Sequence, residues 1–403
     1  MHVLYIICSA APPPGPVRID ICPPLCYFLR IYCRLFSGRK RRSGRFHFMS
    51  RKVTIQDIAD ALGVSRNTVS KAINNTEGLA DVTREKILNK AVEMGYKQFS
   101  YVQSLIQAQA ASPETGGQPQ FQGEIALLTP FYFSNSHFAS TMLDRLQKEL
   151  SQMGYRLNTH IIRAEEIRER RLPFTFIPEQ ASAVICIEMF DWEYSLMLCD
   201  LGLPILFVDG PVGANGRVLP ADKLCMDNMS ELSRLVKLMI GKGIRKIGFL
   251  GDYMHCESFF ERYLAFCSTM FLAGIPVEDR FIIPKNDILE LYQGLEALDE
   301  LPELFICAND FVAYDALQSL RKLGKSVPED VMLAGFDNAP ESRMVVPALT
   351  TIHIHTQVMA FSAAQLLISR IREPSLDFRK IYTETTLVPR ESTGTLLNDE
   401  AQS

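Results

Sequence analysis

Polar side chains follow several apolar runs from Glu124 onward. The runs are EIALL, ASAVICI, PILFV, KIGFL, LFICA and VMLAGF, and the polar residues at their ends include Thr129, Asp209, Asn309 and Asp337. Carboxylates, amides and hydroxyls that converge on one point suit a polyol, because each sugar hydroxyl both donates and accepts a hydrogen bond. The sequence therefore predicts a site for a small hydroxylated molecule.

Two aromatic side chains near these runs could complete such a site. Phe133 follows the first run and Trp192 follows the second. An aromatic ring can stack on the apolar face of a pyranose, but it can equally pack in a core. We keep both interpretations for these two residues.

No pattern typical of catalysis, metal binding or membrane insertion accompanies the polar residues. The chain has no P-loop, GxSxG or HExxH motif, its histidines are scattered, and its ten cysteines form no CxxC pair. No stretch of eighteen uncharged apolar residues occurs. We therefore expect no enzyme activity, no cofactor, no metal and no membrane contact, and reduced cysteines in a cytoplasmic protein.

The elements that must position the polar residues are the apolar runs themselves. Each run is apolar on both faces and is separated from the next by a segment of helical length, which is typical of strands in parallel α/β sheets. The carboxyl ends of such strands line a ligand crevice. This arrangement predicts that the polar residues meet in one cleft.

A different pattern precedes the α/β region. Apolar residues recur at helical spacing from 55 to 62, Gly63 interrupts them, and Ser65 can cap a second helix whose inner face is Val69, Ala72 and Ile73. A third helix is predicted from Thr83 to Gly95. Two short helices joined by a glycine turn, with a third beside them, predict a helix-turn-helix.

The string VTIQDIADALGVSRNTVSKAINN, followed by VTREKILNKAVEMGY, closely resembles the head of the lactose-repressor (LacI/GalR) family. The resemblance implies that Arg66, Asn67 and Lys71 read base edges in the major groove of operator DNA. Ser65, Thr68 and Ser70 are instead interpreted as a helix cap and as phosphate contacts, which position the head without reading the sequence. The implied DNA-binding set is Thr54, Ser65, Arg66, Asn67, Thr68, Ser70, Lys71, Asn74 and Leu105.

Leu105 falls where the family places a leucine that wedges into the minor groove, although it could instead pack within its own chain. Gln98 and Phe99 replace the usual Pro-Asn pair, and Gln103 stands where arginine is common. The following AQAASPETGGQPQFQ resembles a flexible linker and is longer than the family's connection. The hinge is thus the part that departs most from the family.

The α/β region resembles the body of the same family in the strings ESFFERYLAF, FICANDFVAYDAL, VPEDVMLAGFDNAP, LTTIHI and LVPREST. The resemblance implies two periplasmic-binding-protein-like (Rossmann-like) subdomains around a cleft, with Asp209, Arg262, Asn309 and Asp337 at the effector. For Asp209 and Asp337 the alternative is a capping role where a strand turns into a helix. Thr129, Phe133 and Trp192 complete the expected effector set.

These patterns predict a set of domain boundaries. We expect a leader over 1–48 with no regular structure, because translation is expected to begin at Met49. The DNA-binding domain should span 49–97, the hinge helix and linker 98–122, the body 123–395, and a tail 396–403. Within the body, the first subdomain should comprise about 123–221 plus 356–382, and the second about 222–355 plus 383–395.

The charge is distributed unevenly along the chain. Residues 1–48 carry eight basic and one acidic residue, 49–105 carry eight and six, and the remainder carries 26 and 39. Only the head is therefore suited to nucleic acid. We expect a homodimeric repressor that binds palindromic double-stranded operator DNA and responds to a small-molecule effector, a sugar. The alternatives are a solute-binding protein or a sugar-metabolising enzyme with the same body fold.

Overall fold

The computed structural model describes residues 55–73, 80, 83, 86–87, 90, 94, 120–130, 137–213 and 217–397. Residues 1–49, which include the expected leader, lie outside the described residues. Within the described ranges, no helix is both long enough and apolar enough to cross a membrane.

The head contains the two helices that the sequence predicts. These are α3 (Ile55–Leu62) and α4 (Arg66–Ile73), and the side chains of Ile58 and Val69 are fully buried. Gly63 lies between the helices with φ of 65°, a left-handed conformation that glycine adopts without the steric cost of a Cβ atom. Ile87, in the region of the predicted third helix, is also helical and buried.

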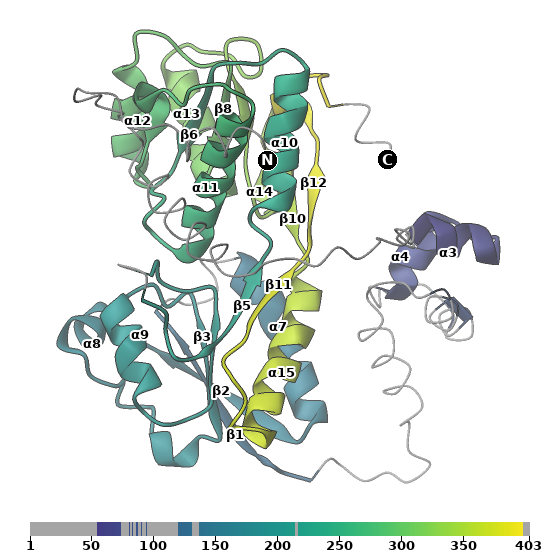
Figure 1. The fold of residues 1–403 in the computed structure, drawn as a ribbon, viewed down its shortest axis with the longest axis vertical. Helices are drawn as coiled ribbons and strands as arrows, with labels where there is room; N and C mark the ends of the chain where they lie inside the picture. The colour runs from purple at the N-terminus through teal and green to yellow at the C-terminus, as the bar shows by residue number, and fades with distance from the viewer. Residues whose placement is uncertain are drawn as a thin grey trace, which may run out of the picture. The chain divides into compact units, whose positions relative to one another are not determined.

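The first subdomain of the body is built on a six-stranded parallel sheet. Its strand order is β11-β5-β4-β3-β1-β2. The strands are β1 (Gly123–Thr129), β2 (Tyr155–Ile161), β3 (Ala183–Ile187), β4 (Ile205–Val208), β5 (Asp222–Met226) and β11 (Lys380–Thr383). Helices α7 (His137–Gln152) and α15 (Thr356–Arg372) cover one face, and α9 (Trp192–Cys199) covers the other, with α8 (Ala164–Glu169) on the same side as α9 (Figure 1).

Alternation along the central strands explains why both faces are covered. Ile125 and Leu127 of β1 belong to the core under α7 and α15, whereas Ala126 and Leu128 belong to the core under α9. Successive side chains of a strand point to opposite faces, so a strand that is apolar at every position must be sandwiched between helices.

The second subdomain repeats this arrangement on a four-stranded sheet of order β7-β6-β8-β9. The strands are β6 (Ile247–Leu250), β7 (Ile282–Ile283), β8 (Leu304–Cys307) and β9 (Met332–Ala334). Helices α10 (Ser230–Gly241) and α11 (Glu257–Leu272) contribute to the core on one face, and α12 (Ile288–Glu296) and α13 (Asp310–Lys322) to the core on the other. Short helical elements complete the two subdomains. They are η2 (Pro178–Gln180) in the first, and η4 (Asp279–Phe281), α14 (Glu341–Met344) and η5 (Glu391–Thr393) in the second.

The chain crosses between the subdomains more than once, and an antiparallel pair, β10 (Thr351–Ile354) with β12 (Thr385–Val388), lies near the crossings (Figure 1). Strand β5 was expected to open the second subdomain, but it pairs with β4 and β11 in the first sheet. Thr383 likewise pairs with Met226 in that sheet. The hydrogen-bonded pairing of the strands therefore places the points where the chain passes to the second subdomain after Met226 and Thr383, rather than at 221 and 382.

Candidate functional site

The first residue of interest in the head is Ser65, which precedes α4. Its Oγ accepts a hydrogen bond from the backbone N–H of Thr68 at 3.1 Å, so Ser65 is the N-cap that the sequence predicts. The Ser65 and Thr68 hydroxyls also lie 2.7 Å apart. The cap fixes where α4 begins and thus which of its residues face outward.

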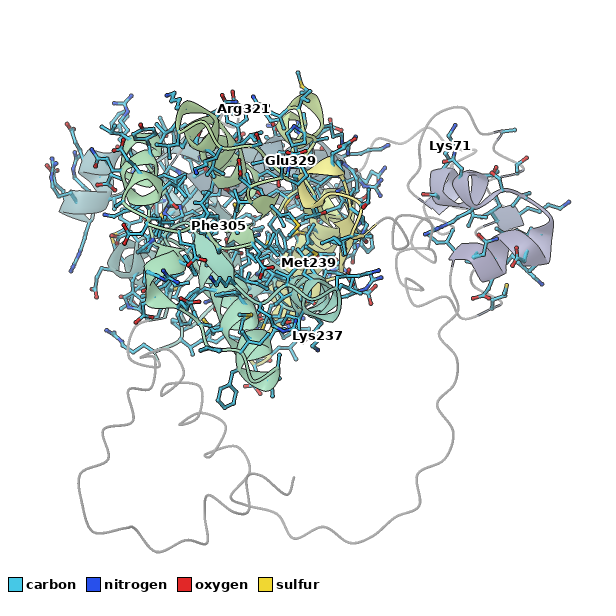
Figure 2. The ribbon with its side chains drawn as sticks, turned by 90° about the horizontal axis from the view of Figure 1, so that it is seen from above. Lys71, Lys237, Met239, Phe305, Arg321 and Glu329 are labelled. Carbon is cyan, nitrogen blue, oxygen red and sulfur yellow. The ribbon has the colours of Figure 1, made fainter. Side chains whose placement is uncertain are left out.

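The outward face of α4 carries the residues that the resemblance assigns to base reading. Arg66, Asn67 and Lys71 are exposed, whereas Val69 and Ala72 are fully buried. Figure 2 shows Lys71 projecting outward from α4. Ser70 and Thr68 are half-buried at the flank of this face. Of the remaining expected DNA-binding residues, Thr54, Asn74 and Leu105 lie outside the described residues.

In the body, the polar residues that follow the strands share an unusual backbone conformation. Glu188, Asp209, Asp337 and Asn338 have φ of 58°, 58°, 112° and 57°. Such left-handed conformations are costly for residues other than glycine and cluster at functional sites. They turn the chain sharply at the ends of β3, β4 and β9 and place these side chains at the edge between the subdomains.

Arg262 of α11 is the centre toward which these side chains converge. Its guanidinium is 2% exposed; it donates from Nη1 to the Ala308 carbonyl at 2.6 Å and from Nε to Asn228 Oδ1 at 3.0 Å. Its Nη2 lies 3.4 Å from Asp337 Oδ1, and its Cζ lies 3.6 Å from the centre of the Phe336 ring. The guanidinium is therefore held on three sides.

The electrostatics of the cluster show how close the carboxylates are. Burial raises the pKa of Asp337 to about 7; the charge of Arg262 opposes this shift, and Asp310, Glu188 and Asp209 add to it. Burial also raises the pKa of Asp310 to about 6 and raises that of Asp209, and Arg262 again opposes both shifts. Several carboxyl groups thus lie close together around Arg262, and Arg390 adds a second positive charge near Asp310.

Two of the expected effector residues also have local structural roles. Asp209 Oδ1 accepts from the backbone N–H groups of Gly210 at 2.8 Å and of Ser258, in the first turn of α11, at 3.2 Å. Asn309 Oδ1 accepts from the N–H of Val312 at 2.9 Å and caps α13. Asp209 therefore links strand β4 of one subdomain to a helix of the other, which agrees with the capping alternative.

Of the two expected aromatics, the structure describes only Trp192, and it does not join Trp192 to this cluster. Trp192 is the first residue of α9, its ring lies 5.7 Å from the Arg217 guanidinium carbon, and its Nε1 has no hydrogen-bond partner among the described residues. Thr129, the last residue of β1, is 1% exposed. Phe133 lies outside the described residues.

A cavity of about 210 Å³ lies beside Asp337. It draws on both subdomains, because Thr141 comes from α7 and Gln357 from α15, while Arg343 comes from α14. The remaining lining residues are Asn338, His353, Ile354 and Thr356. Small-molecule sites usually enclose roughly 300–1,000 Å³, so a larger ligand requires the subdomains to move apart.

No pattern in the sequence marks Asn228, Thr141 or Gln357 as site residues. Asn228 is 1% exposed and follows β5, whose polar residues Asp222 and Lys223 obscure the strand pattern. Thr141 and Gln357 lie within helices, where no periodic signal marks a cavity. Their roles depend on the contact between the subdomains, which the sequence pattern does not encode. Among the described residues, no group of three or more His, Cys, Asp or Glu side chains could hold a metal ion.

Comparison with known proteins gives two family matches. Residues 54–98 match the model of bacterial regulatory proteins of the lacI family, and residues 236–393 match a periplasmic binding protein-like domain. The chain is 26% identical over 357 residues to the transcriptional repressor PurR of Mannheimia succiniciproducens, covering 84% of this chain and 98% of PurR. It is also 26% identical over 352 residues to the regulator GalR of Lacticaseibacillus casei, covering 84% and 99%.

Solved structures share the fold. The regulator CelR in complex with cellobiose superposes with a TM-score of 0.60 at 21% identity and covers 85% of this chain and 100% of its own. The lac repressor dimer bound to operator and the anti-inducer ONPF has a TM-score of 0.56 at 18% identity, covering 85% and 99%. Both confirm the predicted combination of a helix-turn-helix head and a two-subdomain α/β body.

Proposed function

Since the chain belongs to the lacI family of bacterial regulatory proteins and is a DNA-binding transcriptional repressor, we propose that a sugar bound between its body subdomains controls its affinity for operator DNA. The observation that carries this proposal is the cluster of buried carboxylates around Arg262. Asp337 and Asp209 would accept hydrogen bonds from sugar hydroxyls, and Arg262 would donate to them.

The charge balance of the cluster favours a neutral ligand over an anionic one. Four carboxyl groups, Glu188, Asp209, Asp310 and Asp337, lie around Arg262, and Arg390 is a second cation near Asp310. A phosphorylated sugar would add negative charge to this excess of carboxylates, whereas a hydroxyl-rich neutral sugar would supply donors to it. Asn309 and Thr129 would add an amide and a hydroxyl, and Phe133 and Trp192 would supply stacking surfaces if the subdomains rearrange.

For the head, we propose that Arg66, Asn67 and Lys71 read base edges in the major groove. Arginine and lysine donate to guanine, and asparagine pairs with adenine. We propose phosphate contacts for Ser65, Thr68 and Ser70, and keep Thr54, Asn74 and Leu105 as proposed DNA contacts of the same set. The exposure of α4's outer face supports this assignment.

We propose that two copies bind a palindromic operator through a dimer of the body. An exposed apolar patch supports this: Phe311 and Tyr314 of α13 are 41% and 37% exposed, and Met344 and Val346 at adjacent α14 are 79% and 77% exposed. Exposed apolar groups that lie together mark protein interfaces. A symmetric dimer would then present two heads to two half-sites.

A thermal-shift screen of the full chain tests the effector proposal. The probes are neutral monosaccharides and disaccharides, the corresponding sugar phosphates, and purine bases, each compared in wild type and in the Asp337→Asn variant. We expect a neutral sugar to raise the melting temperature of wild type and to do so less in the variant. Stabilisation only by purines or sugar phosphates, or by any ligand equally in both proteins, would contradict the proposal.

A further inference from the structure

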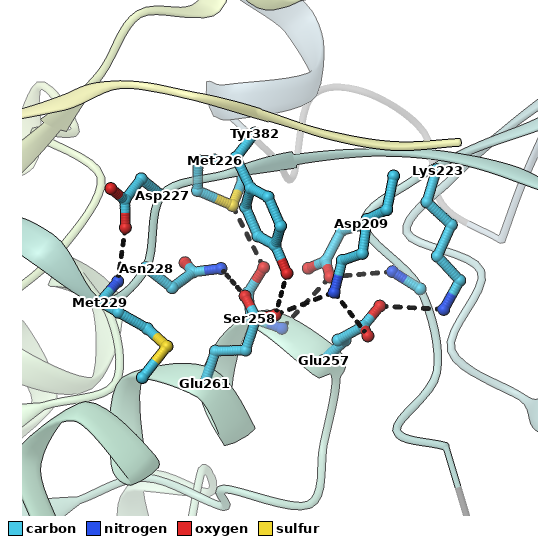
Figure 3. Close-up of polar contacts among 12 residues, drawn as sticks. Asp209, Lys223, Met226, Asp227, Asn228, Met229, Glu257, Ser258, Glu261 and Tyr382 are labelled. Carbon is cyan, nitrogen blue, oxygen red and sulfur yellow. Dashed lines mark hydrogen bonds and ion pairs between the residues drawn. The ribbon is translucent and has the colours of Figure 1, made fainter. Parts of the chain in front are cut away.

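We propose that Asn228 and Glu261 are positioning residues for Arg262, and that they couple the geometry of the proposed effector site to strand β11 of the first subdomain. Figure 3 shows Asn228 and Glu261 within the polar network that links the first sheet to α11. The inference rests on the proposed role of Arg262, but the contacts that carry it are independent of any ligand.

Asn228 fixes one edge of the Arg262 guanidinium. Its Oδ1 accepts from Arg262 Nε at 3.0 Å, and the residue is 1% exposed. An amide can present either its oxygen or its NH2 group, and the NH2 group would face the Arg262 N–H with donor against donor. The bond therefore exists only if something holds the Asn228 amide in one orientation.

Glu261 supplies that constraint. Its Oε2 accepts from Asn228 Nδ2 at 2.8 Å, and a carboxylate can only accept. The Asn228 NH2 group must then point to Glu261, which directs its oxygen to Arg262. Arg262 and Glu261 are consecutive residues of α11, and the Asn228 side chain is hydrogen-bonded to both. Its orientation therefore depends on the positions of both side chains.

The other oxygen of Glu261 connects this pair to β11. Glu261 Oε1 accepts from Lys380 Nζ at 2.9 Å and from the Tyr382 hydroxyl at 2.6 Å. Lys380 and Tyr382 lie on the outer strand of the six-stranded sheet, and Tyr382 is 47% exposed. A hydrogen-bonded path thus runs from this exposed strand through Glu261 and Asn228 to Arg262.

A second carboxylate strengthens the contact without joining the path. Glu257, one turn earlier on α11, binds Lys223 Nζ at 3.0 Å and Lys380 Nζ at 2.9 Å. It has no hydrogen bond to Asn228 or Arg262 in the described part of the chain. Replacing Glu257 therefore weakens the attachment of α11 to the first sheet without removing the contacts that position Arg262, which makes it a suitable control. If α11 moves relative to the first sheet, the Lys380 and Tyr382 bonds to Glu261 break and Arg262 loses its fixed edge.

Arginine Nε–H signals of the full chain, labelled with 15N-arginine, test the proposal in the absence of effector. The Arg262 signal is assigned from its loss in Arg262→Lys, and its hydrogen-exchange rate is compared in wild type, Glu261→Ala and Glu257→Ala. We expect faster exchange by about tenfold or more in Glu261→Ala, the factor that corresponds to ~1.5 kcal/mol for one hydrogen bond to a charged group. Glu257→Ala should leave the rate within about twofold of wild type, because it leaves that bond in place.

Tyr382→Phe provides a milder variant if Glu261→Ala does not fold, because it removes only one exposed hydroxyl. It should accelerate exchange at Arg262 in the same direction. Unchanged exchange in Glu261→Ala or Tyr382→Phe, or equal acceleration in Glu257→Ala, would overturn the proposal. Wild-type operator binding, measured separately by fluorescence anisotropy, reports on the proposed function, so the two can fail independently.

Discussion

Replacing Asp337 with asparagine should stabilise the effector-free protein at high pH. Asp337 is a carboxyl group at the end of β9 whose pKa burial raises to about 7 from an ordinary value of 3.8. The folded state therefore holds a proton on this group at pH values where the unfolded chain has released it. The stabilisation that comes from this bound proton is fully present below pH 4, and it is lost as the pH rises through about 7.

The size of the effect follows from that difference in pKa. A rise from 3.8 to about 7 corresponds to roughly 4 kcal/mol at 1.36 kcal/mol per pKa unit. The side chain is 20% exposed, so solvent screening reduces the cost, and we expect about 2 kcal/mol above pH 7. The attraction to Arg262 is already included, because it opposes the rise in pKa. Asparagine has a similar shape and no charge to bury.

Calorimetry of wild type and Asp337→Asn between pH 5 and pH 8 measures this difference. For a body of this size, 2 kcal/mol corresponds to a melting temperature higher by about 4–8 °C in the variant at pH 8. The difference should shrink steadily as the pH falls toward 4. A variant that is less stable than wild type at pH 8, or a difference that does not depend on pH, would refute the argument that Asp337 is a carboxylate buried at a cost to stability.

Three further substitutions test other parts of the structure. Ser65→Ala should destabilise the head by about 1 kcal/mol through loss of the α4 cap, with Ser65→Thr close to wild type, as measured by circular dichroism melting of the full chain. Gly335→Ala should cost about 1–3 kcal/mol in the urea unfolding of the body, because its Cβ would lie 2.1 Å from Asp310 Oδ1; a neutral effect would refute that close approach. Met344→Asp combined with Val346→Asp should shift the chain from dimer to monomer in sedimentation velocity, and an unchanged dimer would exclude this patch as the interface.

The sequence predicted the central strands because their signals are local. Runs such as AVICI and LFICA are apolar at every position, and the structure buries β3 and β8 completely between helices. The helices of the head were predicted for the same reason, since the spacing of Ile58 and Ala59 and the cap at Ser65 act within one or two turns.

The elements that the sequence did not predict lie at edges and crossings. Strand β2 (Tyr155–Ile161) is an edge strand with several exposed side chains, so its composition is mixed. In β5 the charged residues Asp222 and Lys223 are buried only because partners from distant segments neutralise them: Arg370 and Arg379 pair with Asp222, and Glu257 pairs with Lys223. No local pattern reports such pairs.

The candidate site shows the same division. The strand-end positions of Asp209 and Asp337 followed from the apolar runs, and their approach to Arg262 followed from the family resemblance. That Asp209 also caps α11, and that Asn228 orients Arg262, depends on how the two subdomains meet. Those contacts join residues far apart in the chain and arise only in the folded body.

Selection of DNA from a random duplex library tests the central claim most directly. The full chain is compared with the Arg66→Ala, Asn67→Ala double variant under identical salt conditions, because phosphate contacts make affinity depend strongly on salt. If the account is correct, the wild type enriches an inverted repeat of two half-sites and the variant loses that preference while retaining weak non-specific binding. If wild type enriches no sequence, or if the variant enriches the same one, α4 is not the element that reads DNA.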